Sequence, residues 1–189
     1  MVCFGFRVVM SILIQRILLQ PWLALEEKTN LSRGTMSYTP AFPPVVVPAD
    51  AGRVVHAFGE EVTFHLTGEQ TGGQLSLWTE KVPPGGGPPP HVHLNEDEWF
   101  IVREGKFEFL VEGEWREVRT GGTIYLPRNA VHTFRNSGDG PGLLLVSTSP
   151  AGFETFFSRC AEVFQSPEGP DMERITAIAA EHGIHFIGQ

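Results

Sequence analysis

Turn-forming residues recur at short intervals through the middle of this chain, and they constrain its fold more than any other feature. Between Val54 and Ser147, short apolar or alternating segments are separated by turns such as Gly72-Gly73, Glu112-Gly113 and Gly121-Gly122. Strands spaced by roughly 8–12 residues are typical of an antiparallel barrel or sandwich. The 21 Gly and 15 Pro residues also disfavour a long helical bundle. The sequence therefore predicts an all-β domain.

The hydrophobic period changes after Pro150. Five residues fall at i, i+3, i+4, i+7 and i+11, which is one face of a helix: Phe153, Phe156, Phe157, Cys160 and Phe164. A second helix is predicted from Asp171 to His182, with Asp171 as its start and Gly183 as its stop. We expect these two short C-terminal helices to cap one mouth or flank of the barrel.

The charge and the number of cysteines limit which binding partners and which cellular compartment we expect for this chain. The chain has 14 Lys and Arg against 22 Asp and Glu, a net charge of −8, and it shows no basic stripe of the kind that binds nucleic acid. Two cysteines, Cys3 and Cys160, cannot form a disulfide framework. We therefore expect a reducing, cytoplasmic compartment, no nucleic-acid partner, and a buried packing role for Cys160.

Residues 1–35 do not match the rest of the chain and are treated as an N-terminal extension. The apolar run from Val8 to Ile14 is interrupted by Arg16, and it is shorter than the about 20 apolar residues that span a bilayer. A start codon assigned too early, with Met36 opening the native protein, is the preferred interpretation; a secretory signal or tether and a structural arm are the alternatives. The predicted domains are 1–35, a barrel over 36–150 and a helical segment over 151–189, with no membrane contact for the folded part.

A histidine pair and a glutamate carry the strongest chemical signal. His91 and His93 alternate in an extended strand, so both imidazoles point to one face and can converge on one ion. Glu98 opens the next strand on the same face as Phe100 and Val102, where a carboxylate is unfavourable unless it is paired or bound to metal.

His132 is the fourth candidate ligand, on a later strand where Phe134 shares its face. Three imidazoles and one carboxylate suit a divalent Fe, Mn, Co, Ni, Cu or Zn ion and leave open positions on an octahedral metal. The sequence therefore predicts a single metal site formed by His91, His93, Glu98 and His132, and it does not fix the metal.

Two spaced motifs resemble those of the cupin superfamily. Gly85, His91, His93, Glu98 and Gly105 fit the first motif of the family, and Gly121, Pro127, His132 and Asn136 fit the second. Asn129 stands where the second motif has a glycine, and Asn tolerates the left-handed turn conformation that glycine would supply. The resemblance covers about residues 50–150 and implies a double-stranded β-helix, or jelly-roll, barrel and a homodimer.

Two further segments resemble the quercetin dioxygenase-like branch of the cupins: Glu69 to Gly73 and Pro150 to Glu154. That branch implies a metal-dependent dioxygenase in which Glu98 is the catalytic base. The aromatic residues Phe100, Phe109 and Phe134 have the parity of the barrel interior, so we expect them to line an apolar pocket for a small aromatic or hydroxylated substrate.

The neighbouring charges and the other histidines have plainer interpretations. Glu96 and Asp97 are predicted to be solvated at the rim of the barrel, and Arg128 could reach its mouth. The four remaining histidines have no partner at ligand spacing and are predicted to be exposed or satisfied by hydrogen bonds: His56, His65, His182 and His185.

Three functions remain open at this level. A metal-dependent dioxygenase is preferred. A non-oxidative isomerase or lyase would need a second acid or base in the barrel, and the sequence reveals no convincing inward candidate. A small-ligand-binding cupin without turnover is the third, although the chain has no helix-turn-helix segment of the kind fused to such proteins.

Overall fold

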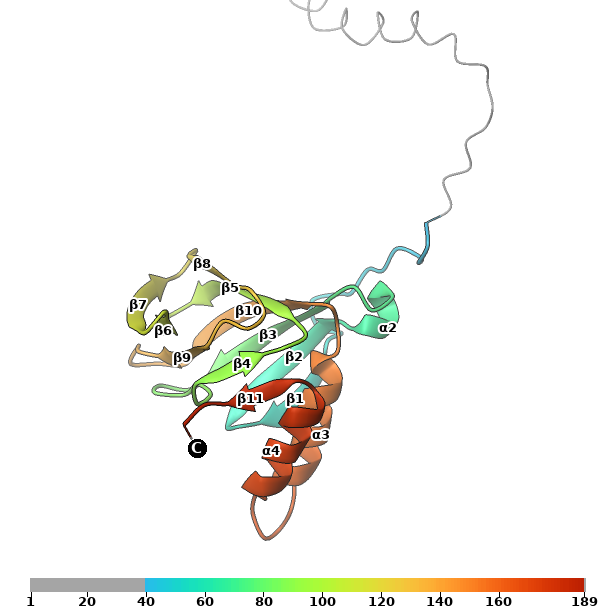
Figure 1. Cartoon of the computed structure of the whole chain (residues 1–189). Helices are drawn as coiled ribbons and strands as arrows, with labels where there is room; N and C mark the ends of the chain where they lie inside the picture. The colour runs from blue at the N-terminus through green and yellow to red at the C-terminus, as the bar shows by residue number, and fades with distance from the viewer. Residues whose placement is uncertain (1–39, 189) are drawn as a thin grey trace, which may run out of the picture. The chain divides into compact units, whose positions relative to one another are not determined.

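Two antiparallel sheets form the described part of the chain, residues 40–188 of a computed structural model (Figure 1). One sheet has the strand order β1 (Arg53–Ala57), β2 (Glu60–Leu66), β3 (Ser76–Val82), β10 (Gly142–Ser149), β5 (Asp97–Glu104) and β8 (Thr123–Leu126). The other has the order β11 (Ile184–Phe186), β4 (His91–His93), β9 (His132–Asn136), β6 (Lys106–Val111) and β7 (Glu114–Arg119). This is the jelly-roll barrel that the sequence predicts. The expectations for residues 1–35 lie outside the described residues.

Strand alternation places the apolar core between the two sheets. In β5 the side chains of Glu98, Phe100 and Val102 are buried, whereas Arg103 is exposed. Because side chains of a strand alternate between its faces, this pattern sets one face of β5 against the facing sheet. The predicted inward parity of this strand is confirmed.

The two C-terminal helices form where their patterns predict them. Helix α3 spans Phe153–Phe164, and α4 spans Met172–Glu181. The Asp171 side chain caps α4 by accepting a 3.0 Å hydrogen bond from the backbone N–H of Arg174, and Gly183 follows the helix with a φ of +74°. The short helix α2 (Gly68–Thr71) and the strand β11 were not expected. β11 pairs with β4 and so extends the sheet that carries His91 and His93.

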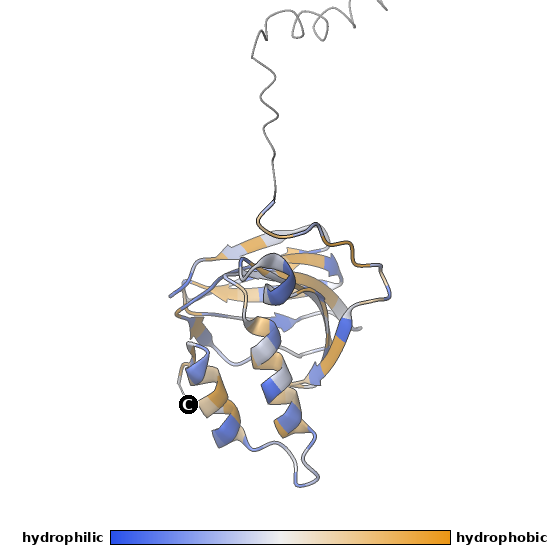
Figure 2. Cartoon of the chain, turned by 90° about the vertical axis from the view of Figure 1, so that its right-hand side faces the viewer, coloured by the Kyte–Doolittle hydropathy of each residue, from blue (hydrophilic) through white to orange (hydrophobic). Residues whose placement is uncertain are grey.

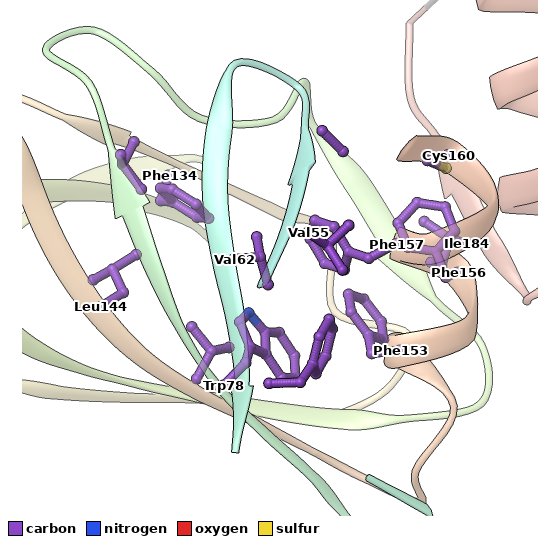
Figure 3. Packing of buried hydrophobic residues seen from close by; sticks show 14 of the residues in the cluster. Val55, Val62, Trp78, Phe134, Leu144, Phe153, Phe156, Phe157, Cys160 and Ile184 are labelled. Carbon is purple, nitrogen blue, oxygen red and sulfur yellow. The ribbon is translucent and has the colours of Figure 1, made fainter. Parts of the chain in front are cut away.

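Helix α3 closes the flank of the barrel with aromatic side chains. Figure 2 shows α3 and α4 side by side, and Figure 3 shows Phe153, Phe156 and Phe157 of α3 on the side of the helix that faces the barrel core with Val55 and Trp78. Phe153 stacks on Trp78 with ring centroids 5.2 Å apart. Cys160 is buried on the same helix, and burial raises the pKa of its thiol to about 12, which agrees with a packing role.

Gly87 and Asn136 hold the segment before β4 against β9. Gly87 has a φ of +144°, and a Cβ at this position would collide with the backbone carbonyl of Phe134. The Asn136 amide donates hydrogen bonds of 2.9 Å to the carbonyls of Val82 and Gly140.

Asn129 adopts a φ of +69°, the left-handed conformation expected for the residue that replaces a motif glycine.

From Phe42 onward the described chain forms one unit, in which α3 packs against β1. Among the described helices, none combines the length and the apolar character needed to cross a membrane.

Candidate metal centre

Strand β4 supplies two of the four candidate ligands from one face. His91 and His93 are both buried, and their ring centroids lie 4.9 Å apart. β4 pairs with β9 so that His91 lies directly opposite His132, with ring centroids 4.4 Å apart. Three imidazoles from two adjacent strands therefore meet at one point of the barrel interior.

Glu98 reaches the same point from the other sheet. Its Oε2 lies 3.2 Å from His132 Nε2 and 3.7 Å from His93 Nε2. The ligand atoms of the four residues all lie within 4.8 Å of one another. The structure thus brings together all four side chains that the sequence selects.

Backbone carbonyls orient two of the imidazoles. His91 Nδ1 donates to the carbonyl of Pro89 and His132 Nδ1 donates to that of Ala130, each at 2.9 Å. Because a carbonyl only accepts, each ring carries a proton on Nδ1, and Nε2 faces the cluster. In His91 this leaves the Nε2 lone pair free for a metal. In His132, Nε2 also faces the Glu98 carboxylate at 3.2 Å; burial opposes protonation, but the hydrogen bond and charge of Glu98 raise the pKa of the ring, so a bound metal would take the place of the proton on Nε2. The orientation of both rings is set by the turn residues that precede each strand.

The protonation states also fit a divalent cation. Burial lowers the pKa of His91 to about 3 and also lowers that of His93, so both rings are neutral at neutral pH. Burial opposes ionisation of Glu98, but the neighbouring His93 and His132 hold the pKa of its carboxyl below its usual value. Among the described residues, neither ring nitrogen of His93 has a hydrogen-bond partner, although the residue is only 2% exposed. An ion held by this donor set would satisfy Nε2, the ring nitrogen that faces Glu98.

The position of Glu96 differs from the prediction that this residue is solvated at the rim of the barrel. It is buried at 7% exposure, and its Oε2 lies 3.9 Å from His93 Nδ1. Burial raises the pKa of its carboxyl to about 7. Glu96 is therefore not a solvated rim charge but the acidic neighbour of the outer nitrogen of His93. Asp97 is partly exposed and pairs with Arg128 at 3.0 Å, and neither side chain lines the cavity at the cluster.

A cavity of about 70 Å³ adjoins the cluster, and its walls are mainly aromatic. Phe100 and Phe134 line it, as the sequence predicts, and Phe153, Phe156 and Phe157 close it from α3. Phe109 does not line it: this ring lies behind the wall, 5.2 Å from the ring of Phe100. Strand parity identifies Phe109 as inward but does not give its depth in the core.

Sequence reasoning missed two acidic residues in the same cavity. Glu60 of β2 and Glu80 of β3 both line it, and they are 6% and 4% exposed. Each shares its inward face with apolar neighbours, Glu60 with Val62 and Glu80 with Trp78. This position on an apolar strand face was the sequence signal that could have identified them. The burial of the two glutamates corrects the expectation that the barrel has no second inward titratable group.

The other four histidines lie outside the cluster. His56 and His185 are exposed. His65 Nε2 lies 3.1 Å from Thr79 Oγ1, and His182 Nε2 lies 3.3 Å from Arg159 Nη1. The prediction that these residues are exposed or satisfied is confirmed.

Comparison with known proteins agrees with this barrel fold. Residues 78–148, from β3 to the end of β10, match the family model described as "Cupin domain". An uncharacterized protein from Aquifex aeolicus is 37% identical over 62 residues, 33% of this chain and 50% of that protein. Another, MJ1618 from Methanocaldococcus jannaschii, is 32% identical over 79 residues, 42% of this chain and 63% of that protein. The chain thus spans about half to two thirds of the length of these curated relatives.

Two solved structures are similar in fold. KdgF from Halomonas sp. has a TM-score of 0.53 at 19% identity, covering 60% of this chain and 99% of KdgF. A predicted oxalate decarboxylase from Thermotoga maritima has a TM-score of 0.50 at 20% identity, covering 56% and 99%. Likeness at this identity concerns the fold alone.

The fold and the site define a class: a small jelly-roll barrel with a buried cluster of three histidines and one glutamate that could hold a metal ion. Residues 78–148 of this barrel match the cupin family model, and the solved structures share its fold.

Proposed function

We propose that this protein is a mononuclear metal-dependent dioxygenase that acts on a small hydroxylated organic substrate. The observation that carries the proposal is the convergence of His91, His93, Glu98 and His132 beside a cavity lined mainly by phenylalanines. A redox-active divalent metal bound there would supply Lewis acidity and the means to use O₂. The apolar wall would exclude water and strengthen the electrostatic interactions inside.

The residues of the chain have separate tasks in this proposal. The three imidazoles hold the metal, with two of them fixed by backbone carbonyls. Glu98 is the only carboxylate of the cluster and has two oxygens, so it can bind the metal and accept the hydroxyl proton of the substrate. Its lowered pKa keeps it ionised and able to take that proton.

The cavity limits the size and charge of the substrate. Its volume of about 70 Å³ is smaller than the cavity of about 150 Å³ that holds benzene in an engineered protein core. No Lys or Arg among the described residues lines it, so nothing but the metal would neutralise a phosphate. A compact, uncharged or weakly acidic hydroxy compound fits better than a flavonol or a sugar phosphate.

Oxygen consumption tests the proposal. Protein loaded with Fe, Mn, Co or Ni should take up O₂ in the presence of a substrate from a panel that runs from small hydroxy compounds through catechols to flavonols. Protein loaded with Zn should not, because Zn²⁺ has no redox chemistry. The compact members should be preferred because the cavity is small. Absence of uptake with every redox-active metal would overturn the dioxygenase assignment.

One observation favours a second candidate, a non-oxidative isomerase or lyase. Such an enzyme needs an acid or base besides the metal ligands, and Glu60 and Glu80 provide two carboxyl groups in the same cavity. Conversion of a compact substrate by Zn-loaded protein without O₂ would select this candidate over the dioxygenase.

A further inference from the structure

Glu60 and Glu80 are two buried acids that the metal cluster does not use. They lie on neighbouring strands, where Glu80 is directly opposite Val62 in the antiparallel register. Both point into the barrel from sheet faces that carry mainly apolar side chains. Burying a carboxyl group in such surroundings is unfavourable unless it is protonated or hydrogen-bonded, so the pair requires an explanation.

Glu60 lies two residues from Val62, the register partner of Glu80, so the two glutamates are diagonal cross-strand neighbours on the same buried face, within reach of each other. Two ionised carboxylates side by side in such surroundings would repel each other without the shielding of water, so at least one of them keeps a proton. Burial, followed by the charge of Glu80, raises the pKa of Glu60 to about 11, and burial also raises that of Glu80. Trp78 Nε1 donates a 3.2 Å hydrogen bond to Glu80 Oε2, which places the remaining negative charge on Glu80.

No basic side chain offsets this acidity. Among residues 40–188, no Lys or Arg forms an ion pair with either carboxyl group. The titratable groups around the pair are those of the shared cavity and of the adjoining outer groove: Glu98, His91 and His93 in the cavity, and Arg53, His56, Glu61 and Lys81 in the groove. The charge of Glu98 raises the pKa of Glu80 further, after burial. The surroundings therefore favour retention of a proton.

The pair lies in the same cavity as the metal cluster but at a different level of the barrel. In the strand register, Glu80 pairs with Leu144 and Leu144 with Val102, whereas Glu98 pairs with Thr148 and Thr148 with Ser76. Glu80 and Glu98 are thus four residues apart along the strands, and one row of the same face, Trp78–Val146–Phe100, lies between them. The pair is too far along the strands to share the ion, but both groups face the space that a substrate would occupy.

We propose that Glu60 and Glu80 form a shared-proton acid pair that exchanges a proton with a small substrate held at the metal cluster. This inference rests on the proposed binding of a hydroxylated substrate there. When the pair acts as a base, a substrate O–H or C–H bond breaks, its electron pair stays on the substrate, and the proton forms a new O–H bond on the ionised carboxylate. The reverse step returns the proton. The pair cycles between one and two protons, because its dianion would place two charges together in apolar surroundings.

The pH dependence of folding stability tests the shared proton without any activity assay. Above about pH 5 an unfolded glutamate is ionised, whereas the buried acid stays protonated. Unfolding then releases a proton, so the stability that the retained proton confers falls as pH rises towards the folded pKa of Glu60, about 11. One such proton lowers the ratio of folded to unfolded protein about tenfold per pH unit.

We expect Glu60→Gln and Glu80→Gln each to lower the number of protons released on unfolding by about one. The measurement runs from about pH 7 to pH 9, where most histidines have already lost their proton. At equal metal content, the ratio of folded to unfolded protein should fall about tenfold less per pH unit in either variant than in the wild type. Glu61→Gln, on the exposed face of the same strand, is the matched control and should keep the wild-type slope. Equal slopes for wild type and both pair variants would overturn the shared proton, whatever the oxygen assay shows.

Proton counting on ligand binding tests the link to the cluster. Acetohydroxamic acid is a compact probe that gives up one proton when it chelates a metal. With Co-loaded wild type, that proton should pass to the pair, and calorimetry in buffers of different ionisation enthalpy should detect little net release. The double variant Glu60→Gln/Glu80→Gln should release about one proton to the buffer per probe bound, because no carboxylate of the pair is left to accept it. The same release from both proteins would show that the pair does not serve the cluster.

Discussion

Substitution of His132 by alanine is expected to abolish tight metal binding. His132 supplies one of four donors, and its Nε2 lies 3.2 Å from Glu98 Oε2, so its removal both opens the cluster and leaves Glu98 without its hydrogen-bond partner. Loss of an outer partner alone typically lowers metal affinity about 10–100-fold, and loss of a ligand should lower it by more than about 100-fold. Metal content after dialysis, measured by elemental analysis, would report the change.

His185→Ala is the matched control for that experiment. His185 is exposed on β11, beside the strand that carries His91 and His93, and its ring is outside the cluster. The control should retain one metal ion per chain. A His132→Ala protein with full metal content and unchanged affinity would contradict the ligand assignment.

Substitution of Phe153 by alanine should have the largest effect on stability and should widen the cavity. The Phe153 ring stacks on His93 at 5.1 Å with an interplanar angle of 6°, and it also stacks on Trp78. Removing a buried phenylalanine typically destabilises a protein by about 3–5 kcal/mol, through lost burial and the cavity left behind. Chemical denaturation would measure this loss, and titration of the metal-loaded protein with catechol would show tighter binding than in the wild type.

Phe164→Ala separates the two effects of that substitution. Phe164 lies at the other end of α3, packs on Phe58 with ring centroids 5.0 Å apart, and does not line the cavity. It should lower stability without improving catechol binding. If wild type and Phe153→Ala bind catechol equally, the cavity does not limit substrate size.

The metal cluster was predictable from sequence because its geometry is largely local. Two of its ligands alternate on one short strand and a third opens the strand that follows, so strand parity alone aims them at one side. The remaining ligand, His132, needs only its pairing opposite His91. Strand positions were predictable for a similar reason, because turn residues separate the strands: β8 (Thr123–Leu126) begins directly after the turn Gly121-Gly122.

The acid pair was not predictable in the same way. Glu60 and Glu80 lie on separate strands, and each in isolation resembles an exception to an apolar face. Only the antiparallel register of β2 and β3 shows that the two exceptions meet. The depth of Phe109 and the burial of Glu96 likewise depend on what packs from other elements, which spacing along the chain does not encode.

Strand β11 also could not be predicted from the sequence. Three residues after a helix stop carry too little periodic pattern to identify a strand. Their strand conformation comes from pairing with β4, in which Ile184 lies opposite His93 and Phe186 opposite His91. The C-terminal segment thus covers the open edge of the strand that carries two of the candidate ligands.

Anomalous diffraction from crystals of the full-length protein loaded with Co²⁺ or Zn²⁺ would test the central claim most directly. The structure predicts one strong peak at the metal absorption edge, enclosed by His91, His93, Glu98 and His132, with the nitrogen ligands at about 2.0–2.1 Å for zinc. A fully loaded crystal with no peak among these four side chains, or with its strongest peak elsewhere on the protein, would contradict the metal centre.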